Sequence, residues 1–185
     1  MDVSAIVTPR LELVPASRAL LDALLEGRRD EAEAALGGSI PPGWPDEAVA
    51  PFLRLRRDQI RRDPATQPWL VRFLVARAEP RTLVGHAGFH GPPGVNALGA
   101  ADAVELGYAL FPEHRGRGLA TEAVEALVRW AAAEHGIRRF VASVAPANEP
   151  SLALARRLGF VHVGEHSDEE DGRELEFELL LEDGP

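Results

Sequence analysis

The sequence predicts a mixed α/β domain with one central sheet, and three observations support this. Segments that alternate apolar and polar residues, as strands do, are interspersed with segments whose apolar residues recur every three or four positions, as in helices. Between residues 104 and 158 the order is strand, glycine-rich loop, helix, strand and helix. The length of 185 residues fits one domain of ordinary size, so we expect residues 1–185 to form one domain.

The N-terminal third is expected to supply one strand and two helices. Residues 11–14 alternate apolar and polar side chains and predict a short strand. From 17 to 36 four leucines fall on one face, which predicts a helix ending at Gly37. After a proline-rich irregular stretch, a further helix is expected from residue 46 to residue 62.

The middle of the chain predicts a hairpin followed by a loop. Residues 69–77 and 82–89 alternate as strands do, and a proline-containing turn at 79–81 joins them. Residues 91–103 are rich in Gly, Pro and Ala and predict a mobile loop.

The second half shows its elements more clearly. Both of its helices are followed by a glycine, Gly136 and Gly159, at the position where helices commonly end. The expected elements are a strand at 104–110, a helix at 121–135, a strand at 139–144, a helix at 150–158, and strands at 160–165 and 174–181 joined by an acidic turn at 168–172.

Composition excludes several classes of function. The formal net charge of −9 argues against nucleic-acid binding, which needs a basic face, and suits attraction of a cationic acceptor. The absence of cysteine excludes disulfides and thiolate nucleophiles, and the six histidines show no metal-ligand spacing, so no metal is expected. No apolar run is long enough for a membrane helix and the N-terminus lacks a signal-peptide pattern, so we expect a cytoplasmic protein with no membrane partner.

The loop at 114–120 has the features of an anion site. Gly116 and Gly118 allow the backbone to approach a ligand closely, and the following helix begins with N–H groups that lack internal partners. Arg115 and Arg117 add positive charge. The Walker pattern is excluded because the chain has no lysine, and the Rossmann pattern fails at Thr121. A plain strand-to-helix turn is the alternative.

Two motifs carry a resemblance to a known family. The pattern Arg115-x-x-Gly118-x-Ala120, after a strand and before an amphipathic helix, resembles the Q/R-x-x-G-x-G/A signature of the GNAT superfamily of N-acetyltransferases. The second motif is Asn148-x-x-Ser151 followed by Leu-Gly-Phe at 158–160, which resembles the Asn-led helix and turn of that superfamily.

The E-x-G-Y strand and the R-G-x-G-x-A-T-E-A segment resemble the branch of ribosomal-protein N-terminal (alanine/serine) acetyltransferases. The resemblance implies a three-layer fold whose mixed, mostly antiparallel sheet of about six or seven strands contains a splayed parallel central pair and is flanked by helices. It places acceptor-side helices at about 15–65 and an acetyl-CoA-binding core at about 104–160.

The resemblance also implies acetyl-CoA as co-substrate. The loop would bind the diphosphate, the backbone of the preceding strand end would bind the pantetheine arm, and Asn148 would contact that arm or else serve turn chemistry. The residues expected to bind the coenzyme are Leu110, Phe111, Arg115, Gly116, Arg117, Gly118, Leu119, Ala120, Thr121 and Asn148.

Two residues are candidates for the chemistry. Glu105 lies on a strand face with two small residues, and the resemblance gives it the role of general base; a solvated or ion-paired acid is the alternative. Ser151 matches the family serine near the coenzyme sulfur, or else satisfies backbone groups at a helix start. Ala155 stands where many members carry a tyrosine acid, so the acid role stays open.

The acceptor side is less defined. His86 and His90 lie four apart on one strand and could border the acceptor; Trp44 and Phe52 could wall it or pack in the core. The acidic turn at 168–171 could attract a cationic amine or be a solvated turn. The expected partners are a small-molecule or protein amine, without nucleic acid or membrane, and a homodimer is one option for the assembly.

Together these features predict an acetyl-CoA-dependent N-acetyltransferase that moves an acetyl group to a primary amine by direct attack in a ternary complex. The primary amine is either a protein N-terminal α-amine or a small molecule. One alternative is a non-catalytic domain of the same fold that binds or senses coenzyme A. The other is a structural domain without ligand, against which the loop at 115–120 and Asn148 argue.

Overall fold

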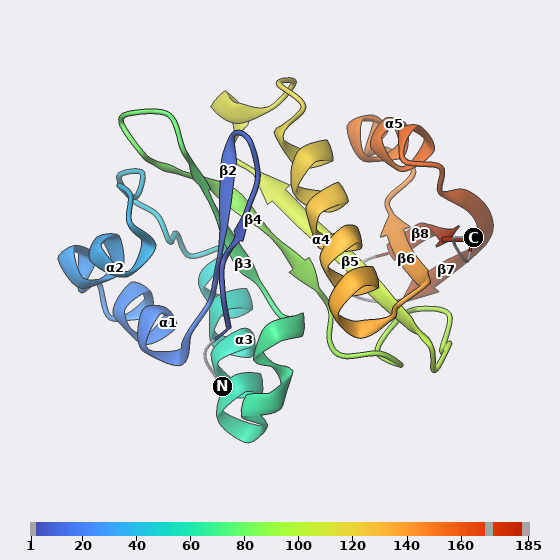
Figure 1. Ribbon diagram of the computed structural model, residues 1–185, viewed down its shortest axis with the longest axis horizontal. Helices are drawn as coiled ribbons and strands as arrows, with labels where there is room; N and C mark the ends of the chain where they lie inside the picture. Colours follow the sequence, from blue (N-terminus) through green and yellow to red (C-terminus); the bar gives the residue numbers. More distant parts are fainter. Residues whose placement is uncertain (1–2, 169–171, 183–185) are drawn as a thin grey trace. The chain divides into compact units, whose positions relative to one another are not determined.

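The computed structural model describes residues 3–168 and 172–182 (Figure 1). The chain divides into two compact units. The first unit comprises Met1–Gly88 and Tyr108–Ala123, and the second comprises Phe89–Gly107 and Val124–Pro185. Strands β4 (Leu83–Phe89) and β5 (Ala103–Leu110) and helix α4 (Leu119–His135) each contribute residues to both units. The expectation of one domain stays a prediction.

The remaining elements alternate helices and strands along the chain. Before β4 they are β1 (Ile6–Val7), β2 (Leu11–Pro15), α1 (Arg18–Leu25), α2 (Arg29–Leu36), α3 (Ala50–Arg62), the 3-10 helix η1 (Pro64–Trp69) and β3 (Arg72–Ala76). After β5 they are the 3-10 helix η2 (Pro112–His114), α4, β6 (Arg139–Val144), α5 (Glu149–Arg157), β7 (Val161–Asp168) and β8 (Gly172–Leu180).

The strands follow the hydrogen-bonded order β1-β2-β3-β4-β5-β6-β8-β7, which confirms the predicted mixed sheet. β5 and β6 pair in parallel, with Ala103–Glu105 opposite Arg139–Val141, so the central parallel pair is confirmed as well. The pairs β1–β2, β2–β3, β3–β4, β6–β8 and β7–β8 are antiparallel. Within residues 3–168 and 172–182 the sheet has eight strands, one more than the upper expected number, because the two-residue β1 pairs with β2 at one edge.

In the first unit, three helices pack on strands β3 and β4 through one apolar cluster (Figure 1). The single helix expected from 17 to 36 is wrong, because Gly27 takes a left-handed conformation (φ 71°) that ends α1. Ser17 caps α1 by accepting a hydrogen bond from the Leu20 N–H. The helix expected from residue 46 begins later, at Ala50. The Asp46 carboxylate accepts the backbone N–H groups of Ala48 and Val49, so these residues form a turn ahead of the helix.

The strand expected from residue 69 also begins later, at Arg72. Asp63 caps η1 and two prolines occupy this short helix, so the chain turns once more before it extends. Trp44 makes edge contacts with Phe73 and Phe111, at ring-centroid distances of 5.8 and 5.9 Å, and it packs against the core of the first unit. This supports the core-packing alternative for Trp44.

In the second unit, α4 and α5 end at the two glycines that the sequence indicated. Gly136 and Gly159 have φ values of 68° and 85°, the left-handed conformation expected after a helix. The loop at 91–103, expected to be mobile, is held by the Asn96 amide, whose Nδ2 donates to the carbonyl oxygens of Ala100 (2.7 Å) and Ala103 (3.1 Å).

Candidate active site

The predicted anion loop has the backbone geometry that requires glycine. Gly116 and Gly118 have φ values of 70° and 74°, a region that side chains with a Cβ rarely adopt. In the described part of the chain, no group accepts a hydrogen bond from the backbone N–H groups of residues 116–121. The residues from 115 to 118 are exposed. A run of free donors at the start of a 17-residue helix suits an anionic ligand.

The strand end before this loop is held by its own chain. The Arg115 Nε donates to the Leu110 carbonyl oxygen at 3.0 Å, and the Phe111 N–H donates to the Val84 carbonyl oxygen at 3.0 Å. One guanidinium nitrogen of Arg115 therefore fixes the end of strand β5 by a hydrogen bond. The expected contacts of Leu110 and Phe111 with pantetheine, and of Arg115 with phosphate, stay predictions.

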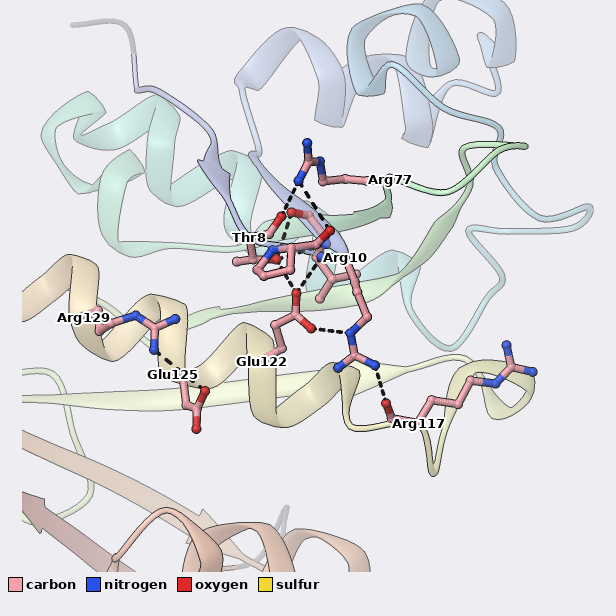
Figure 2. A network of polar contacts seen from close by, with 9 residues as sticks. Thr8, Arg10, Arg77, Arg117, Glu122, Glu125 and Arg129 are labelled. Carbon is pink, nitrogen blue, oxygen red and sulfur yellow. Dashed lines mark hydrogen bonds and ion pairs between the residues drawn. The ribbon is translucent and has the colours of Figure 1, made fainter.

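A network of polar contacts connects the turn before β2 to the loop at 114–120 and the start of α4 (Figure 2). The Glu122 carboxylate accepts hydrogen bonds from the Thr8 hydroxyl (2.6 Å), the Arg10 backbone N–H (2.8 Å) and the Arg10 Nε (2.6 Å). The Arg10 Nη1 also donates to the Arg117 carbonyl oxygen at 2.7 Å. Burial alone would raise the pKa of Glu122, but these hydrogen bonds outweigh burial and lower it.

Glu105 is buried on β5, with 4% of its surface exposed. Its Oε2 accepts the Ala97 N–H at 2.7 Å, and its Oε1 accepts the Ser143 hydroxyl from β6 at 2.8 Å. The Nδ1 of His90, a half-exposed side chain, lies 3.5 Å from the same Oε1. The loop at 91–103 and β6 therefore hold one carboxylate in a fixed orientation, beside a half-exposed histidine.

Comparison with known proteins identifies the family. The model of the acetyltransferase (GNAT) domain matches residues 10–161. The chain belongs to the GNAT acetyltransferase family.

Relatives and solved structures agree with this assignment. The uncharacterized N-acetyltransferase YjdG of Bacillus subtilis (strain 168) is 26% identical over 154 residues, which cover 83% of this chain and 88% of YjdG. A solved GnaT-family acetyltransferase of Bordetella pertussis is 29% identical, has a TM-score of 0.66, and shares 95% of this chain and 99% of its own. RimL, a ribosomal L7/L12 alpha-N-protein acetyltransferase solved in complex with coenzyme A, has a TM-score of 0.64 over 96% of this chain and 98% of its own. At 20% identity this likeness supports the fold of the present chain alone.

In this GNAT protein, Asn148 is the N-cap of α5. Its Oδ1 accepts the Ser151 N–H at 3.3 Å. The Asn148 side chain therefore satisfies a backbone donor at the helix start, which is the alternative role considered for it. Ser151 therefore lies in the first turn of the helix. The roles of Asn148 toward the coenzyme and of Ser151 as acid stay predictions.

The other acceptor-side candidates have different outcomes. The His90 Nε2 lies 3.1 Å from where a Cβ on Gly107 would be, so His90 occupies the space that the missing side chain of Gly107 leaves. Residues 169–171 of the acidic turn lie outside the described residues.

The described ranges contain no group of three His, Cys, Asp or Glu side chains able to hold a metal and no helix suited to cross a membrane.

His86 has a different environment from the exposed histidines. It stacks on Phe52 at a centroid distance of 5.0 Å, and Arg56 lies over the same phenyl ring at 4.9 Å. Its Nδ1 is buried without a hydrogen-bond partner in the part of the chain that the structure describes. Burial, and secondly the charge of Arg56, lower the pKa of His86 to about 4.

We expect His86 to make folding pH-dependent. Between pH 6.5 and about 4 the unfolded chain binds a proton at this histidine and the folded chain does not, so stability falls as the pH falls through this range. The loss reaches at most about 3 kcal/mol. His86→Phe keeps a stacked ring that cannot titrate, so urea unfolding at pH 5 and pH 7.5 should differ less for this variant than for the wild type. Equal differences would contradict the assignment, and the exposed His162→Gln is the matched control.

Several residues of these sites were not found from the sequence. Ser143 carried a weak signal, since it is a hydroxyl in a strand that is otherwise apolar after Arg139. Thr8 and Arg10 lie more than a hundred positions from Glu122, and nothing in their spacing indicates that they meet.

Proposed function

We propose that this acetyltransferase moves the acetyl group of acetyl-CoA to a primary amine by direct attack within a ternary complex. The observation that carries the proposal is the Glu105 carboxylate, which is buried and held by hydrogen bonds from two neighbouring segments. A carboxylate oriented in this way, beside a half-exposed histidine, suits a group that accepts a proton during the reaction.

The chemistry requires a neutral amine. An alkylamine of pKa about 10.4 is almost fully protonated at pH 7, and its deprotonation costs about 4–5 kcal/mol. In the proposed reaction the amine loses a proton to Glu105, directly or through water, and its nitrogen attacks the thioester carbon. The C–N bond forms and the C–S bond breaks. The attacking nitrogen then gives up its second proton to water, and the leaving coenzyme A thiolate takes up a proton, for which the Ser151 hydroxyl, reprotonated from that water, is the candidate donor.

The coenzyme is proposed to be held by the loop after β5. The free backbone N–H groups of this loop, from Gly116 to Thr121, and the guanidinium of Arg117 would contact the diphosphate of the coenzyme. The solved structure of RimL with coenzyme A supports coenzyme use by this fold.

The acceptor is proposed to be a cationic amine, either a protein α-amine or a small molecule. The net charge of −9 favours its approach, and RimL is named as an alpha-N-protein acetyltransferase. Cytoplasmic location and a homodimer are compatible with this proposal.

Thiol release from acetyl-CoA, measured with a panel of amines, tests the function. The panel contains peptides with a free N-terminus, polyamines and amino acids, each compared with its N-acetylated form as a blocked control. We expect release above background with at least one free amine and none with its blocked form. Coenzyme binding without release for any member would favour the alternative, a coenzyme A binding or sensing domain.

A further inference from the structure

We propose that Arg10 is a positioning residue for the loop at 114–120, which it orients by donating a hydrogen bond to the carbonyl oxygen of Arg117. This inference rests on the proposed coenzyme binding at that loop. Arg10 lies in the turn before β2, far from the loop in sequence, and none of the motifs that indicate coenzyme binding includes it.

The Arg10 guanidinium joins two groups at once (Figure 2). Its Nε donates to the Glu122 Oε2 at 2.6 Å and its Nη1 donates to the Arg117 carbonyl oxygen at 2.7 Å. Both distances are typical of strong, charge-assisted hydrogen bonds. The planar guanidinium therefore connects the first turn of α4 to the peptide that precedes it.

The Glu122 end of this connection is rigid. Its side chain is only 12% exposed, and the Thr8 hydroxyl and the Arg10 backbone N–H also donate to it. The Thr8 hydroxyl in turn accepts the Leu11 N–H at 3.0 Å, and Arg77 donates to the Thr8 carbonyl oxygen at 2.7 Å. The turn that carries Arg10 is thus fixed from several sides, unlike an isolated surface ion pair.

The Arg117 carbonyl controls the direction of the neighbouring donor. In a planar trans peptide the C=O and the N–H point in opposite directions. Because Arg10 holds the Arg117 oxygen, the N–H of Gly118 in the same peptide points away from Arg10. This N–H has no acceptor in the described residues and is available to an anion. Gly118 has few other restraints, since its φ of 74° lies in a region that glycine enters freely.

The first test is the affinity for coenzyme A, measured by calorimetry well below the melting transition. Arg10→Ala should weaken binding by about tenfold, the effect of one lost charge-assisted contact. Arg18→Ala is the matched control, because it removes the same charge from another exposed arginine, whose ion pair with Asp22 spans 3.6 Å. Equal affinities of the two variants would overturn the inference. Failure of the wild type to bind coenzyme A would instead overturn the proposed function.

A second variant separates positioning from simple charge attraction. Glu122→Gln removes a negative charge near the loop, so attraction alone predicts tighter coenzyme binding. Loss of the group that orients Arg10 predicts weaker binding, by severalfold, and no further loss when Glu122→Gln is added to Arg10→Ala. Tighter or unchanged binding by Glu122→Gln would overturn the positioning role. The melting temperature of each variant shows that binding is measured on folded protein.

Discussion

Glu105→Gln should lower the turnover of an alkylamine acceptor by about 10²–10⁴-fold, the usual contribution of a general base. The amide cannot accept the proton, yet it fits the site. Its oxygen can accept the Ala97 N–H, and its NH₂ group can donate to the Ser143 hydroxyl, which then reverses its role. Turnover of an acceptor with a low pKa should fall much less, because that amine is already neutral at pH 7.

The controls distinguish a base from a structural anchor. Glu134→Gln changes an exposed acid in the same unit and should leave turnover unchanged. Ser143→Ala removes one hydrogen bond to Glu105 but keeps the carboxylate, so it should cost far less than Glu105→Gln. Wild-type turnover by Glu105→Gln across pH 6–9 with both acceptors would show that Glu105 only anchors the loop at 91–103.

Gly118→Glu should reduce the affinity for coenzyme A by more than about a hundredfold, since it sets a negative charge beside an anionic ligand. The substitution also forces a side chain into a left-handed conformation, with φ of 74°. A Cβ at this position would lie 3.5 Å from the Arg10 Nη2, an ordinary contact, so overlap with neighbouring atoms does not explain the loss. Calorimetric titration of coenzyme A measures the effect.

Gly27→Glu is the matched control for this substitution. Gly27 also has a left-handed φ of 71°, a Cβ there would meet no atom within 4 Å, and it lies in the same unit. The control carries the same charge change and similar backbone strain, so it should destabilise the fold yet keep its coenzyme affinity. Similar affinities for the two variants would remove the loop from the binding site.

The sequence predicted most accurately those features that depend on local backbone chemistry. Gly116 and Gly118 in the loop, and Gly136 after α4, have left-handed conformations, in agreement with the loop and the helix end that these glycines indicated. The burial of Glu105 agrees with its place in a strand with mostly apolar neighbours. These predictions succeed because periodicity and glycine act within a few residues.

Features that depend on distant contacts were not predicted. The break at Gly27 competes with a continuous leucine pattern, and spacing alone cannot show which one prevails. Arg10 and Glu122 meet only after β2 and α4 are in place, and Ser143 reaches Glu105 only through the parallel pairing of β5 and β6. Tertiary packing determines these pairs, so a periodicity pattern cannot contain them.

The most direct test of the account is the stoichiometry of the reaction, followed by mass spectrometry of the amine and of the intact protein together with thiol release. Direct attack predicts one acetylated amine for each thiol released, and no acetylated protein when acetyl-CoA is supplied alone. Coenzyme A binding without any acetylated amine, or thiol release with acetyl on the protein before an amine is added, would contradict it.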